Sequence, residues 1–290
     1  IDATLKEILE YPNAVAHQLL EGCSIDNSDM HAWEGFESPF KYWILFTLFS
    51  KSEHPAFIAA NVLVLNNTEG LKTLDGIDKA SQVQAVLIGQ STTLEDISAL
   101  GKLYKFRRGL DNAFIRPQLF LHNLSNVKDF SCLEKMQSTE LELWKLPHLT
   151  DGTQFGQMTG GYGLMKLRVI ECGVVDLGDL SALQYLQEYR VENCPDLESL
   201  GLHNFEKPIS TFQYSDCPNL RSLEGLGIAH PTMTELHLLN MPNLTSLNGL
   251  PESLTTLKIE NCQIADFESL QALCSLQSLT INQKSLCLSH

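Results

Sequence analysis

The chain has 290 residues, a formal net charge of −15 and an isoelectric point near 4.9. A field of that sign repels phosphate groups, which excludes a general nucleic-acid binder and a protein held on an anionic membrane. The longest apolar run, residues 42–49, is too short to span a bilayer, so membrane insertion is not expected. The eight cysteines form no C-x-x-C pair and no metal-ligand spacing. They predict reduced thiols in a cytoplasmic protein that uses no metal and no cofactor.

Residues 1–58 carry no repeat and are predicted to form an N-terminal helical cap. Asp2 and Ser38 are helix-capping residues, and the aromatic stretch Phe40–Phe49 is the last expected helix. We expect this cap to cover the end of the array that follows, because an end coil otherwise exposes its core. A separate docking module is the alternative. Because the chain starts at Ile1, a signal or another domain upstream is left open.

The rest of the chain, residues 59–290, repeats one short pattern. Each copy begins with an apolar–x–apolar doublet, which predicts a strand with one face buried. Leucines then follow at three-residue steps, which favour a tight 3₁₀ or irregular turn over a long helix. Such coils stack, so that their strands form a parallel sheet and their leucines form one core. The clearest copies start 23, 24 and 21 residues apart and read YRVENCPDLESL from Tyr189, FQYSDCPNLRSL from Phe212, LHLLNMPNLTSLNGL from Leu236 and LKIENCQIADFESL from Leu257.

Weaker copies extend the array to about ten or eleven coils, and self-similarity at such a period is the signature of a repeat architecture. The stretch 104–117 fits the pattern poorly, and Tyr104 with Phe106 is interpreted as a degenerate coil. The glycine-rich residues 159–163 lack the spacing of a nucleotide-binding fingerprint and are interpreted as an insertion. The doublets that start the other weak coils are at Leu63, Val86, Leu119, Leu141, Leu167 and, last, Leu279.

The phrases ENCPDL at 192–197 and DCPNL at 216–220 resemble the leucine-rich repeats of plant intracellular immune receptors and of bacterial effectors delivered into host cells. The resemblance covers residues 60–288. It implies an α/β leucine-rich repeat solenoid, with a curved parallel sheet on the concave face and mostly 3₁₀ or irregular backbone on the convex side. It also implies a protein partner on the concave face, in the cytoplasm or, for an effector, inside a host cell. The alternative is the ligand-sensing repeat domain of a larger intracellular immune or signalling receptor.

Counting around each doublet gives the strand positions that face away from the core. We expect them to form an exposed grid of mixed charges with strands about 4.8 Å apart. Arginine and aromatic residues are enriched at protein interfaces, so we predict a monomeric scaffold that binds a protein partner through this grid. A solvated face with cross-strand Glu–Arg and Glu–Lys pairs is the alternative. The predicted partner-binding residues are Glu140, Glu142, Trp144, Arg168, Glu188, Arg190, Gln213, His237 and Lys258.

Two further groups of side chains carry weaker signals. Cys23 with His17 or His54 is the one pairing of a nucleophile with a base that stands out, and no other catalytic motif accompanies it. We therefore predict that the protein is not an enzyme. A basic cluster coincides with the poorest repeat and is interpreted as a solvated loop rather than a binding site for an acidic partner; its members are Lys102, Lys105, Arg107, Arg108 and Arg116.

Overall fold

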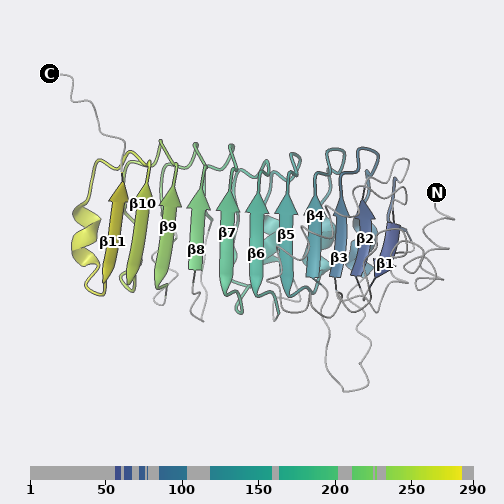
Figure 1. Ribbon diagram of the computed structural model, residues 1–290, viewed down its shortest axis with the longest axis horizontal. Coiled ribbons are helices and arrows are strands. Elements are labelled where there is room, and N and C mark those ends of the chain that lie inside the picture. Colours follow the sequence, from purple (N-terminus) through teal and green to yellow (C-terminus); the bar gives the residue numbers. More distant parts are fainter. Residues whose placement is uncertain are drawn as a thin grey trace, which may run out of the picture.

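The computed structural model describes residues 56–59, 62–66, 72–75, 77, 85–102, 118–158, 163–201, 211–224, 226 and 233–282. In that part of the chain an 11-stranded sheet is formed, and its strands lie side by side in sequence order (Figure 1). The strands are β1 (Ala56–Ala59), β2 (Val62–Asn66), β3 (Ala85–Gly89), β4 (Gln118–His122), β5 (Glu140–Trp144), β6 (Lys166–Ile170), β7 (Glu188–Glu192), β8 (Thr211–Ser215), β9 (Glu235–Leu239), β10 (Thr256–Glu260) and β11 (Ser278–Asn282).

Strands β2 to β11 run parallel to one another. Leu236 of β9 pairs with Leu257 of β10, so the apolar doublets of successive coils stack on one face. The helical turns between the described strands are short: the 3₁₀ helices η3 (Ser98–Lys102), η4 (Ser131–Lys135) and η5 (Glu268–Ala272), and the single α-turn α5 (Thr153–Gly156). The predicted leucine-rich repeat solenoid, with a parallel sheet on one side and tight turns on the other, is confirmed.

The coil predicted at Tyr104 and Phe106 adds no strand to the sheet. Strand β3 pairs directly with β4, with Val86 opposite Leu119, so nothing intervenes between them. The prediction of a separate coil there is therefore wrong at the level of the sheet.

Strand β1 is not predicted by the repeat pattern. It pairs antiparallel with β2, with Ala59 opposite Val62, and it covers the edge that β2 would otherwise leave free. Three of its four residues fall at the end of the segment 1–58, after the last expected helix, and Ala59 falls in the predicted array. The predicted helices themselves lie in residues 1–55, outside the described residues. An exposed edge gains hydrogen bonds from any extended neighbour, which is how a segment without the repeat pattern can join the sheet.

The core is a continuous row of fully buried leucines. In the coil that starts with β9, the side chains of Leu236, Leu238, Met241, Leu244 and Leu247 are all 0 % exposed. The same positions are buried in the neighbouring coils, and together they form a single hydrophobic cluster. Burial of this kind contributes about 1.5–3 kcal/mol per side chain, and it arises only when coils are stacked.

Each described coil from β3 to β10 turns its corner through one residue in the left-handed backbone conformation, directly after the strand. These eight residues have φ between 50° and 56°. Asn193 and Asn240 are two of them, and asparagine tolerates this conformation better than most residues. The backbone N–H of Asn193 donates to the carbonyl of Ser215 on the next strand at 3.0 Å. The asparagine or aspartate that precedes each cysteine in the clear repeats is thus explained by the corner.

The cysteines after the corner point into the core. Cys172, Cys194 and Cys217 are buried free thiols in consecutive coils. The Cys194 Sγ lies 3.5 Å from the Glu192 carbonyl at the end of its own strand. Burial raises the pKa of the Cys172 thiol far above its ordinary value, so this side chain behaves as a small apolar residue rather than a nucleophile.

Candidate partner-binding face

The face of the sheet that points away from the leucines, called the outer face below, carries the predicted partner-binding residues. They lie at the first, third and fifth positions of their strands, which alternate with the inward-facing second and fourth positions. The third positions form one row across the sheet, because the strands are in register. From β5 to β10 this row consists of Glu142, Arg168, Arg190, Gln213, His237 and Lys258. The sequence prediction therefore places these residues on one face; their role in binding stays a prediction.

Arg168 is the centre of a buried ion-pair network. Its Nε donates to Glu188 Oε1 at 2.9 Å, and its Nη1 donates to Glu140 and, at 3.4 Å, to Glu142 Oε2. Arg168 and Glu140 are only 3 % and 2 % exposed. Burial opposes the charge of the guanidinium, but the hydrogen bond to Glu188 and the charges of the three carboxylates outweigh it and raise the pKa of Arg168.

The expectation that Glu140 and Arg168 are exposed is therefore wrong. Counting along a strand shows which face a side chain takes, but it does not show whether its neighbours fold over it. Long Glu and Arg side chains on adjacent strands, about 4.8 Å apart, bridge one another and shield their own charges from water. These two residues hold neighbouring strands together and offer little surface to a partner.

Trp144 is held in place by its own chain. Its Nε1 donates to Glu171 Oε1 at 2.9 Å, and its ring packs edge-on against His122 with centroids 5.3 Å apart. The Nζ of Lys145 lies 4.9 Å from the ring centroid, a cation–π contact, and 3.5 Å from Glu171 Oε2. A fully exposed tryptophan would indicate a partner-binding site. Trp144 is half-buried and already contacts His122, Lys145 and Glu171, so it gives no such indication. His122, which sequence reasoning missed, belongs to this cluster.

The outer face is closed at its N-terminal part. Leu87 of β3 and Phe120 of β4 lie in the same row as Glu142, pointing away from the leucine core, and both are 0 % exposed. All five residues of β3 are buried. Leu87 and Phe120 therefore offer no accessible surface to a partner at these strands. A signal was present in the sequence: β3, with the sequence AVLIG, is apolar on both faces, as strands covered on both sides are.

The outer face is accessible over strands β7 to β10. The side chains of Arg190 and Lys258 are 35 % and 38 % exposed. Arg190 Nε and Gln213 Nε2 both donate to Glu192 Oε1 at 2.9 Å, and Lys258 Nζ lies 3.2 Å from Glu260 Oε1. His237 is half-buried between them. This is a row of polar side chains with water on one side, oriented by neighbours but not enclosed by them.

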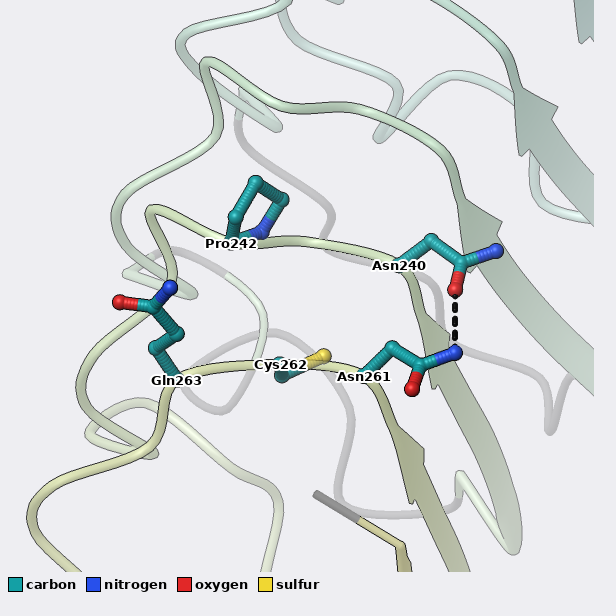
Figure 2. Close-up of a pocket in the computed structure, with 5 residues that line it drawn as sticks. All are labelled: Asn240, Pro242, Asn261, Cys262 and Gln263. Atoms are coloured by element: carbon teal, nitrogen blue, oxygen red, sulfur yellow. Dashed lines mark hydrogen bonds between the residues drawn. The ribbon is translucent and has the colours of Figure 1, made fainter. Parts of the chain in front are cut away.

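A small pocket lies at the corners that follow β9 and β10 (Figure 2). Its volume is about 270 Å³, and it is lined by Asn240, Pro242, Asn261, Cys262 and Gln263. The Nδ2 of Asn261 donates to Asn240 Oδ1 at 2.8 Å, and the Nδ2 of Asn240 donates to Asp216 Oδ1 at 2.8 Å. These amide groups link successive corners along the solenoid, which gives them a structural role.

The other predicted groups are described only in part. Lys102 is exposed, and its Nζ lies 4.0 Å from Asp75 Oδ1. The remaining members of the basic cluster, the glycine-rich residues 159–162 and the pair of Cys23 with His17 or His54 all lie outside the described residues. In the described ranges no helix is long and apolar enough to cross a membrane.

Comparisons with known proteins find likeness in structure only. No protein-family model and no curated protein matches the chain. Among solved structures, internalin C2 of Listeria monocytogenes aligns with a TM-score of 0.44 and 18% identity, over 76% of this chain and 80% of that one. A second internalin of the same organism, internalin F, aligns with a TM-score of 0.39 and 18% identity, over 77% of this chain and 67% of that one. At this identity neither likeness says what the present chain binds.

Acid should remove the contribution of Glu142 to stability. Burial would raise the pKa of this carboxyl, but the hydrogen bond and charge of His122, 3.0 Å away, and the charge of Arg168 lower it below its ordinary 4.5. A pKa lowered in the folded state gives stability that is complete above the unfolded pKa and is lost as the pH falls through the folded pKa. The free energy of unfolding of the native chain should therefore fall more steeply below pH 4.5 than that of Glu142→Gln. Denaturant titrations across that range measure both slopes; equal slopes would disprove the coupling.

Proposed function

We propose that the chain is a protein-binding scaffold whose partner contacts the outer face of strands β7 to β10. The observation that carries the proposal is the accessible row Arg190, Gln213, His237 and Lys258, on a sheet whose outer face is closed at β3 and β4. Strands about 4.8 Å apart present this row as a rigid, regularly spaced surface, which costs little entropy to bind. Glu188 flanks the row, and Glu140, Glu142 and Arg168 support the sheet beside it.

The partner is expected to carry a surface of mixed charge that is positive on balance, with an acidic group opposite Arg190. The outer positions of β7 to β10 hold the acidic Glu188, Glu192, Glu235 and Glu260 against the basic Arg190 and Lys258. The net charge of the whole chain is −15. Opposite charge on a partner speeds association and makes it sensitive to salt. The free thiols of the described coils fit a reducing compartment. We also propose delivery into a host cell as an effector, and this part of the proposal is supported by the sequence resemblance alone.

The test is a pair of double substitutions. A partner is first captured from an extract and identified by mass spectrometry, and its affinity is then measured by titration. Arg190→Ala with His237→Ala removes two members of the row and should weaken binding at least tenfold, which corresponds to about 1.4 kcal/mol. The melting temperature should change little, since the Arg190 side chain is 35 % exposed and its ion pair lies at the surface.

The matched control changes one basic residue and one histidine away from the sheet. Lys135 ends the 3₁₀ helix η4, and His148 lies in the turn after β5; both are exposed. Lys135→Ala with His148→Ala should leave the affinity unchanged. Equal losses in the two double variants, or no loss in the first, would move the binding site off strands β7 to β10.

A further inference from the structure

The last described strand of the sheet, β11, has an exposed edge. In β11 all five residues are exposed. Leu279 and Ile281 occupy the inward-facing doublet, yet they are 43% and 40% exposed, whereas Leu257 and Ile259 of β10 are 0% exposed. Phe267, directly before η5 in the turn between β10 and β11, is 38% exposed. Strand β11 and helix η5 lie together at the left end of the molecule (Figure 1). Among the described residues nothing pairs with one edge of β11, so this edge offers backbone hydrogen-bonding groups next to open apolar surface.

We propose that β11 pairs antiparallel with β11 of a second copy of the chain, about a twofold axis at Thr280. The strand reads Ser-Leu-Thr-Ile-Asn, polar and apolar in turn around its centre. Pairing about that centre sets Leu279 of one copy opposite Ile281 of the other, on the core face, and Thr280 opposite Thr280 on the outer face. Two copies of one edge are thus complementary to each other, as a twofold interface requires.

The charge distribution at this edge permits such an approach. The outer positions of β11 are Ser278, Thr280 and Asn282, which are uncharged, whereas those of β5, β6, β7, β9 and β10 include charged residues. An edge strand that must stay single usually carries charge as protection, and this one does not. Facing Thr side chains across antiparallel strands form a favourable pair. No like charges are then opposed at the paired strands, although each copy has a net charge of −15.

The other end of the sheet already contains a contact of the same kind. Strand β1 pairs antiparallel with β2 and covers its free edge. The second copy would do the same for β11, and it would also extend the leucine core across the axis. The sequence alone predicts a monomer, because the doublet of the last coil looks like every other doublet until its exposure is known. This inference concerns a different surface from the proposed partner-binding row and does not depend on it.

The expected association is weak. Five paired residues and the side chains beneath them bury less than the roughly 800 Å² per partner of a standard interface, so a dissociation constant in the micromolar range is expected. Sedimentation of the full chain from about 1 to about 200 μM should show the mass rising from one copy to two. Added salt should strengthen the dimer, because it screens the repulsion between two acidic chains. A single copy at every concentration would overturn the proposal and leave another occupant, such as residues 283–290 that follow β11, to cover the edge.

Two substitutions test the axis. Thr280→Lys sets two like charges opposite each other and should abolish the dimer, with the melting temperature of the dilute, monomeric chain unchanged. The control is Thr256→Lys, the same change on the outer face of β10, where Thr256 pairs with Ser278. It should leave the dimer intact. Loss of the dimer in both variants, or in neither, would contradict pairing through β11.

The register is tested with engineered cysteines in a background with Cys23, Cys274 and Cys287 changed to Ser, which removes the exposed thiol before β11 and the two thiols outside the described residues. Thr280→Cys brings two thiols together at the axis, where antiparallel Cα atoms lie about 4.5–5.5 Å apart, within disulfide range. Ser278→Cys leaves its two copies about 13 Å apart along the strands. A mild oxidant should produce a covalent dimer from Thr280→Cys and little from Ser278→Cys. The reverse result, or equal yields, would rule out this pairing.

Discussion

Replacing Arg168 with alanine should destabilise the protein by about 3–5 kcal/mol, which is the cost of breaking a buried ion pair from one side. The side chain of Arg168 is 4% exposed, and it lies within 4 Å of three carboxylates. Without it, Glu140 remains buried with its negative charge uncompensated, and it is repelled by Glu142 on the same strand and by Glu188 on β7. The free energy of unfolding from denaturant titration measures the effect.

Arg190→Ala is the matched control for that experiment. Arg190 lies next to Arg168 in the same outer-face row, but its side chain is 35% exposed. Its ion pair with Glu192 lies at the surface, where removal costs about 0–1 kcal/mol. A loss at Arg168 no larger than the loss at Arg190 would show that the carboxylates are solvated and that the network is not a support of the sheet.

Gly156→Ala should cost at least about 3 kcal/mol or prevent folding, because it forces two coils apart. A Cβ at position 156 would lie 1.7 Å from the Asp179 carbonyl oxygen in the next coil. That neighbour is backbone, so no side chain can rotate away to make room. The solenoid would have to open its stacking at this point, which also disturbs the leucines that the two coils share.

Gly101→Ala separates this close approach from the general effect of replacing a glycine. Gly101 lies in η3, and a Cβ there would meet its nearest atom, in the Lys135 side chain, at 3.6 Å, which is ordinary van der Waals contact. We expect a change within about 1 kcal/mol, with a tendency to stabilise because alanine restricts the unfolded chain. Similar melting temperatures for the two variants would contradict the close packing of α5 against the next coil.

The repeat architecture could be predicted because its signal is repeated in every coil. The doublet Leu236–x–Leu238 and its counterparts determine which residues face inward, and each is reinforced by neighbours in register. The recurrence of Asn193 and Asp216 before the repeat cysteines can be seen in the sequence. Only the backbone shows that these residues adopt the left-handed conformation. Period and spacing thus predict both the sheet and the face that carries the candidate site.

The features that escaped prediction depend on contacts between coils or on the ends of the array. The burial of Arg168 depends on carboxylates from β5 and β7, 20 or more residues away in the chain. Trp144 is not a free, exposed anchor because its indole N–H donates a hydrogen bond to Glu171 on the following coil. Strand β1 and the open edge of β11 are end effects, and a repeat pattern contains no information about where stacking stops.

The measurement that tests the central claim most directly is site-specific photo-crosslinking in a native extract. A photoreactive residue in place of Gln213 sits in the middle of the accessible row on β8, and one in place of Lys135 sits away from the sheet at the end of η4. If strands β7 to β10 form the partner-binding face, position 213 should capture one defined protein, which an excess of unlabelled chain displaces, and position 135 should not. Capture from position 135 with none from position 213 would contradict the account.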